Sequence, residues 1–97
     1  MIRREGERML VSGSLTLANV AAVLAEGNAA IGEGARTVDL AEVGELDSSA
    51  LALPLSWLRE AKRRNLSIVF TNLPKGLTTI ARLYGVAELL PASPAHH

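Results

Sequence analysis

Short apolar runs alternate with segments of helical periodicity along this chain, and the alternation restricts its fold more than any other feature. Strand-like runs occupy residues 8–15, 36–40 and 66–71. Each is followed by a segment whose apolar residues recur at spacings of three and four, which is typical of a helix. Strand–helix–strand units of this length predict parallel neighbouring strands. Residues 1–4 lead into a Glu5-Gly6 turn and predict an antiparallel hairpin at one edge of the sheet.

We therefore expect an α/β fold, with a small mixed sheet of three to four strands and three to four helices packed on it. Thr16 is predicted to be the N-cap of the first helix, and residues 41–46 are predicted to form a loop. The run 66–71 is nearly continuous in apolar residues, which indicates a central strand covered on both faces. Pro74 is predicted to open the third helix and Gly85 to end it.

The composition limits the chemistry that the chain can perform. It contains no cysteine, which excludes disulfides, thiolate catalysis and zinc sites with sulfur ligands. Its only histidines are His96 and His97, which we interpret as the remnant of a purification tag. The usual nucleophile–base pairs cannot be built from the remaining residues, and neither common glycine-rich phosphate loop occurs. We therefore expect no enzymatic activity, no cofactor and no metal.

Charge and hydropathy restrict the partners. Ten basic residues balance ten acidic ones, so no net charge attracts nucleic acid or an anionic membrane. The N-terminus has no signal-peptide pattern, and the longest apolar run, residues 50–55, is far too short to span a membrane. A chain of 97 residues has the size of one domain. These features predict a soluble, single-domain protein.

The run Asp47-Ser48-Ser49, at the predicted start of the second helix, has two interpretations. The structural one is capping, because Asp and Ser side chains accept hydrogen bonds from the free N–H groups of a helix start. The functional one uses the same geometry. A serine hydroxyl at this position is exposed and lies where a helix dipole stabilises a phosphate.

The second helix also leaves two alternatives open. A helical wheel places Leu51, Leu55 and Leu58 on the core side, with Leu53 and Trp57 on the flank. Trp57 could pack under a loop and Leu53 be an isolated surface leucine, as is common. Alternatively, the two form an apolar partner-binding patch beside the serines, since tryptophan is enriched in interface hot spots.

The strand, the Leu46-Asp47-Ser48-Ser49 sequence and the apolar helix after it resemble the signature region of STAS domains. The resemblance extends over residues 1–91 and leaves 92–97 as a disordered tail. The family includes the anti-sigma factor antagonists, in which the hydroxyl residue after the aspartate is phosphorylated. In this chain that residue is Ser48.

A second stretch narrows the resemblance. Residues 80–86, Ile-Ala-Arg-Leu-Tyr-Gly-Val, followed by Leu-Leu-Pro at 89–91, are similar to the C-terminal end of MlaB-type STAS domains. These are the STAS subunits of the Mla phospholipid ABC transporters at the Gram-negative inner membrane. The resemblance implies a cytoplasmic, non-catalytic subunit that supports the transporter's ATPase and reaches the membrane only through that complex. The expected partner-binding residues are Asp47, Ser48, Ser49, Leu53 and Trp57.

The alternative function within the same family is an anti-sigma factor antagonist that binds an anti-sigma kinase and is switched by phosphorylation of Ser48. A small-ligand module is a weaker third alternative, because no phosphate loop supports it. Two residues depart from the family pattern: Ala50 stands where glycine is usual, and Pro54 falls within the second helix. Pro54 predicts a kink or a loosened first turn there.

Overall fold

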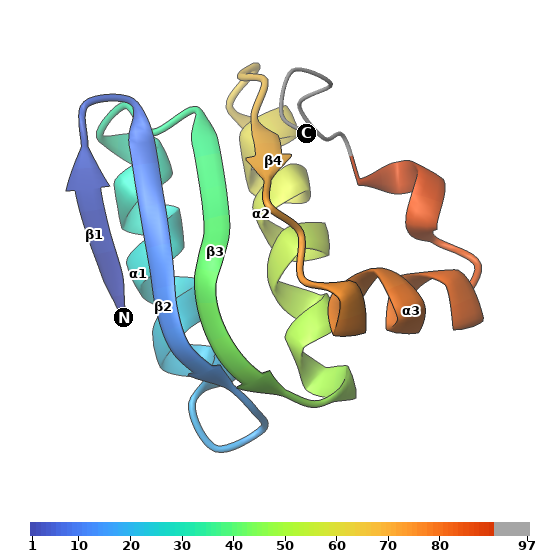
Figure 1. Ribbon diagram of the computed structural model, residues 1–97. Helices are drawn as coiled ribbons and strands as arrows, with labels where there is room; N and C mark the ends of the chain where they lie inside the picture. The colour runs from blue at the N-terminus through green and yellow to red at the C-terminus, as the bar shows by residue number, and fades with distance from the viewer. Residues whose placement is uncertain (91–97) are drawn as a thin grey trace.

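The structure is a computed structural model, and it describes residues 1–90 (Figure 1). Within them, strands and helices alternate as the sequence predicts. The strands are β1 (Ile2–Glu5), β2 (Arg8–Leu15), β3 (Thr37–Leu46) and β4 (Val69–Thr71). The α-helices are α1 (Val20–Gly32), α2 (Ala52–Arg63) and α3 (Lys75–Leu83), and two 3-10 turns are η1 (Ser48–Leu51) and η2 (Ala87–Leu89). The predicted tail at 92–97, with its histidines, lies outside the described residues.

The sheet is mixed, with the strand order β1-β2-β3-β4. The hairpin β1–β2 is antiparallel, and its turn contains Gly6 with a φ of 63°, a conformation that favours glycine. The pairs β2–β3 and β3–β4 are parallel. These findings confirm the predicted α/β fold, its antiparallel edge hairpin and its parallel strands.

The core lies between the sheet and the helices. Figure 1 shows α1 and α2 side by side behind the sheet, with α3 beyond β4 near the end where the parallel strands finish. The largest fully buried side chains are Trp57, Phe70, Met9, Leu15, Ile31, Leu40, Leu53, Leu77, Val11 and Val38. In strands β2 and β3, alternate residues such as Met9, Val11, Val38 and Leu40 enter this core because successive side chains point to opposite faces.

Three sequence predictions about element boundaries are wrong. Helix α1 begins at Val20 and not after Thr16, because the side chain of Asn19 accepts a hydrogen bond from the Thr16 N–H and holds 16–19 as a turn. The predicted loop 41–46 is strand, since it continues the parallel pairing until Leu15 faces Leu46. The predicted central strand is β4, a three-residue strand at the edge of the sheet.

Pro54 does not kink α2. It is the third residue of that helix, where its missing N–H is one of the groups that have no partner at a helix start. The departure from regular α geometry occurs just before it, in the 3-10 turn η1. The predicted end of α3 is confirmed, because Gly85 has a φ of 73°, and α2 ends in the same way before Asn65, whose φ is 60°.

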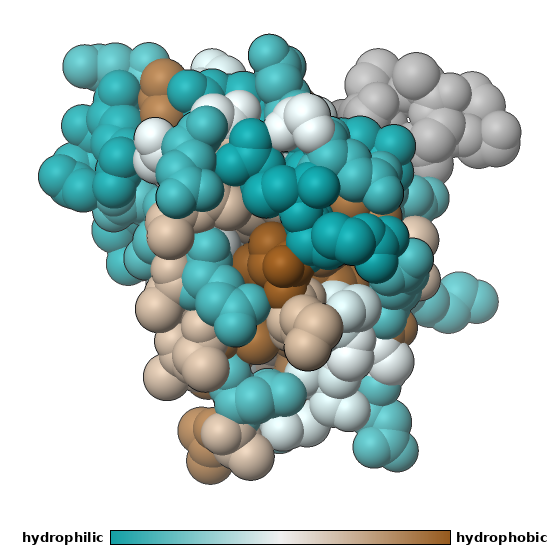
Figure 2. Space-filling view, turned by 90° about the vertical axis from the view of Figure 1, so that its left-hand side faces the viewer, coloured by the Kyte–Doolittle hydropathy of each residue, from teal (hydrophilic) through white to brown (hydrophobic). Residues whose placement is uncertain are grey.

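The surface over β1 and α1 is hydrophilic in the upper part of Figure 2 and paler or more hydrophobic in its lower part, with a hydrophobic area in the hollow at its centre. That hollow is lined in part by Ile2, Ala29 and Ala30. No helix within residues 1–90 combines the length and apolarity that are needed to cross a membrane.

Candidate partner-binding surface

Asp47 fixes the turn that follows β3. Its carboxylate oxygen Oδ1 accepts the Ser49 N–H at 2.9 Å and also the Ser49 hydroxyl, so Asp47 is the N-cap of η1. Its other oxygen, Oδ2, accepts the Leu17 N–H at 3.2 Å, and its own N–H donates to the Leu15 carbonyl at 3.2 Å. The carboxylate therefore ties together the chain segments that leave two adjacent strands.

These hydrogen bonds favour the charged form of Asp47. The Ser49 hydroxyl and then the Leu17 N–H are the main groups that hold the pKa of Asp47 below its usual value. Asp47 is thus ionised at neutral pH, with its oxygens already engaged within the molecule. The capping interpretation of the Asp-Ser-Ser run is correct for Asp47, whereas the Ser49 hydroxyl caps no N–H and donates to the Asp47 carboxylate.

Ser48 has a different environment from its two neighbours. It is the first residue of η1, its side chain is exposed, and its hydroxyl takes part in no hydrogen bond within residues 1–90. A hydroxyl that caps nothing and faces solvent is free to donate to a partner or to accept a phosphate. The turn is therefore rigid through Asp47 and Ser49, while Ser48 remains available.

Two further elements border this turn. Leu17 is 78% exposed, although its N–H is bound to Asp47 and its loop is held by Asn19, whose Nδ2 donates to the Ser14 carbonyl. On the other side, the start of α3 packs on the end of β3, since a Cβ on Gly76 would lie 3.4 Å from Leu46. The sequence did not identify Leu17 as a residue of this surface, because its spacing from the next apolar residues is typical of a helix. Helix α1 begins only at Val20.

Leu53 and Trp57 do not belong to this surface. They are 1% and 0% exposed, and the Trp57 Nε1 donates to the Leu24 carbonyl of α1 at 3.2 Å. The predicted apolar patch beside the serines is therefore wrong, because both side chains fill the space between α2, α1 and the sheet. The alternative is correct only in that Trp57 is packed inside, although it lies against α1 and not under a loop, and it is wrong for Leu53, which is not on the surface.

Residues 1–91 match the family described as the MlaB STAS domain. The chain belongs to this family. Members of the STAS family generally act as non-catalytic binding proteins in protein–protein interactions. A comparison with curated proteins finds no match.

Solved structures with the same fold include anti-sigma factor antagonists. SpoIIAA of Bacillus, in its unphosphorylated form, shares 17% identity and a TM-score of 0.69 with this STAS domain, covering 98% of this chain and 88% of SpoIIAA. The phosphorylated form gives 17% identity and a TM-score of 0.65, with 98% and 91% covered. A Thermotoga maritima protein described as an anti-sigma factor antagonist gives 10% identity and a TM-score of 0.73, with 95% and 83% covered.

The open face of the STAS sheet holds a polar network that the sequence did not reveal. Asp39 of β3 is 5% exposed and lies on the face opposite the helices. Its Oδ2 accepts Arg8 Nη2 at 2.6 Å, and its Oδ1 accepts the Asn72 amide at 3.1 Å and the Ala41 N–H at 2.9 Å. Within residues 1–90 no three histidine, cysteine or acidic residues cluster as a metal site would need. The hydrogen bonds of Asp39 link β3 to β2 and to the segment that follows β4.

Asp39 makes stability depend on pH. Burial alone would raise the pKa of Asp39, but the Ala41 N–H, the Asn72 amide and the Arg8 guanidinium outweigh it and lower this pKa. A carboxyl whose folded pKa is lowered stabilises the fold above its unfolded pKa of about 3.9, and this contribution is lost as pH falls through the folded pKa. We expect Asp39→Asn to lower the free energy of unfolding by about 2 kcal/mol at pH 7, because hydrogen bonds to a charged group are replaced by neutral ones.

Urea unfolding at pH 7 and at pH 3 measures this prediction. The difference between the wild type and Asp39→Asn should shrink at pH 3, because this pH lies below the unfolded pKa of about 3.9 and the wild-type carboxyl then takes up a proton on unfolding. A difference that stays the same at both values would mean that the charge of Asp39 does not stabilise the fold.

Proposed function

We propose that this STAS domain is a non-catalytic subunit that binds the ATPase of an Mla-type phospholipid ABC transporter through the Ser48 turn and supports its activity. The observation that carries the proposal is the free, exposed hydroxyl of Ser48 on a turn that Asp47 and Ser49 hold rigid. Membership of the MlaB-type family supports this choice of partner.

A protein partner suits the chemistry of this turn. Its exposed groups are one hydroxyl and the side chain of Leu17, which a complementary protein surface can bury while bonding the hydroxyl. The turn is fixed before binding, because Asp47 joins it to the loop of Leu17. Little conformational entropy is then lost on docking, which favours affinity for a small contact. We place the protein on the cytoplasmic side of the membrane, where such an ATPase works.

The alternative proposal is an anti-sigma factor antagonist switched by phosphorylation of Ser48. The exposure of Ser48 favours it, because a kinase must reach the hydroxyl. A phosphate there would place roughly two negative charges next to the ionised carboxylate of Asp47. These charges would repel a partner that had docked on the turn. The similarity to SpoIIAA, at 17% identity, supports the fold of this alternative and not its partner.

A pull-down from native cells separates the two proposals. The tagged chain is captured, and its bound proteins and its own intact mass are read by mass spectrometry. We expect an ABC ATPase subunit among the bound proteins and a chain without added phosphate. Recovery of an anti-sigma kinase, together with a chain that carries one phosphate on Ser48, would contradict the transporter role and favour the alternative.

A further inference from the structure

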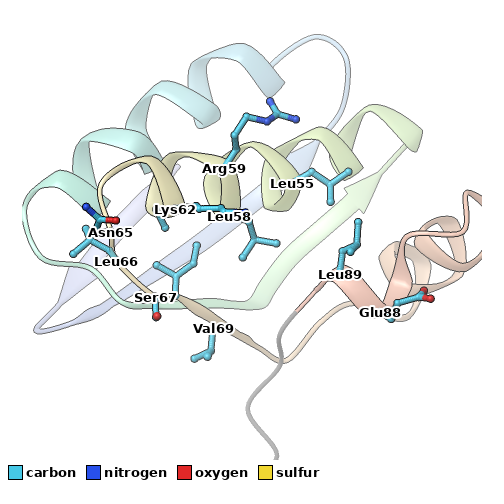
Figure 3. Close-up of a pocket in the computed structure, with 12 residues that line it drawn as sticks. Leu55, Leu58, Arg59, Lys62, Asn65, Leu66, Ser67, Val69, Glu88 and Leu89 are labelled. Atoms are coloured by element: carbon cyan, nitrogen blue, oxygen red, sulfur yellow. The ribbon is translucent and has the colours of Figure 1, made fainter.

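A groove with a volume of about 960 Å³ lies between α2, the start of β4 and η2. Figure 3 shows Leu55 and Leu58 projecting from α2 on the side of β4, with Leu89 of η2 facing the same space. Leu66 and Val69 add to its apolar lining. Leu55 and Leu58 are only half-buried and Leu89 is 55% exposed. The groove extends along α2 from Leu55, in the first turn of this helix, to Asn65, just after its end.

One wall of the groove is an unpaired strand edge. β4 is the last strand in the sheet order, and no strand within residues 1–90 pairs with its outer side. The Val69 N–H points inward, since it donates to the Arg36 carbonyl at 3.0 Å. Backbone groups of successive residues in a strand face opposite sides, so those of Ile68 and Phe70 face the free edge. A peptide can satisfy these groups, whereas a hydrocarbon chain cannot.

The rim of the groove is basic. Arg59 and Lys62 line it, and neither forms an ion pair within residues 1–90. In contrast, Arg63 at the end of α2 and Arg64 just after it both form ion pairs with Glu60, with N–O distances of 2.6 Å. One acidic residue, Glu88, also lines the groove. The charge that remains at the rim therefore complements an acidic occupant.

We propose that this groove is a second protein-binding site, which takes an extended peptide segment of a partner with apolar and acidic residues at alternate positions of one strand face. The segment pairs with the free edge of β4 and turns that face toward α2, so that its apolar side chains lie against the leucines and its acidic side chains reach Arg59 and Lys62. A flat anionic membrane fits less well, because the leucines line a hollow and do not protrude. This site is independent of the proposed docking at Ser48.

A synthetic probe tests the proposal on the full chain. The probe is the blocked peptide Leu-Thr-Glu-Thr-Leu-Thr-Glu, whose leucines and glutamates share one strand face, and binding is followed by the NMR amide signals of Ile68 and Phe70. We expect saturable shifts with the wild type and at least tenfold weaker binding to the double variant Arg59→Glu, Lys62→Glu. The matched control is the double variant Lys75→Glu, Arg82→Glu, which reverses two exposed cations of α3. It should bind the probe with an affinity within twofold of that of the wild type.

Three outcomes would overturn the peptide site. The probe could fail to bind the wild type. This outcome would also follow if residues after Leu90 occupied the groove. It could bind equally well to the charge-reversed variant, or equally well after N-methylation of alternate peptide bonds, which removes strand pairing. Vesicles containing phosphatidylglycerol serve as the competing probe. Binding to vesicles but not to the peptide, lost in the charge-reversed variant, would assign the two cations to a membrane surface.

Discussion

Gly27→Ala is expected to destabilise this fold more than the size of one methyl group suggests. A Cβ on Gly27 would lie 2.3 Å from three indole atoms of Trp57, far inside contact distance. The indole cannot move aside, because it is fully buried and bound to the Leu24 carbonyl. Helix α1 must instead move away from α2. Overpacking of this kind costs about 3 kcal/mol, while the better helix propensity of alanine returns only about 1 kcal/mol.

The net loss of about 2 kcal/mol should lower the melting temperature by about 10 °C in a domain of this size. Circular dichroism and the fluorescence of Trp57, the one tryptophan of the chain, report it. Gly32→Ala is the matched control at the end of the same helix. There the new Cβ would meet only the flexible end of Arg64, which can move, so the melting temperature should not fall. A Gly27→Ala variant as stable as the wild type would contradict the described packing of α1 on α2.

Ser48→Glu is expected to abolish recovery of the ATPase while the fold remains intact. Glutamate at the first position of η1 is compatible with the start of a helix, so the melting temperature should change little. In the complex, the new carboxylate would be buried beside the ionised Asp47 without a partner. Such a charge costs about 2–5 kcal/mol, which corresponds to at least about thirtyfold weaker binding. Titration of the purified ATPase against each variant measures the loss.

Ala25→Glu is the control for that experiment, because it places a new carboxylate at an exposed position of α1 that lies in neither the turn nor the groove. Its affinity for the ATPase should equal that of the wild type. Equal losses for Ser48→Glu and Ala25→Glu would indicate a nonspecific effect of negative charge. Full affinity of Ser48→Glu would exclude the turn from the interface.

The face of α2 could not be read from the sequence, because the phase of a helix depends on where and how it begins. A 3-10 turn advances about 120° per residue and an α-helix about 100°. The four residues of η1 therefore rotate α2 by about 80° relative to its orientation in a continuous α-helix. This rotation turns Leu53 and Trp57 into the core and leaves Leu55 and Leu58 at the groove.

The length of β3 was hidden for a related reason. Two register shifts between β2 and β3 place extra residues in β3, so its apolar residues no longer alternate strictly after Leu40. Asp39 was equally hidden, because its partners Arg8 and Asn72 are far from it in the sequence. In contrast, the turns at Gly6, Asn65 and Gly85 depend on single residues that tolerate positive φ, and these were predictable.

Docking of the ATPase on the Ser48 turn can be tested most directly by photo-crosslinking in native cells. A photoreactive phenylalanine is placed at position 48 and, in a second strain, at position 25 on the exposed face of α1. We expect a covalent adduct with the ATPase subunit from position 48 and none from position 25. An adduct with the ATPase from position 25 alone, or an adduct of position 48 with a different protein, would contradict docking on the turn.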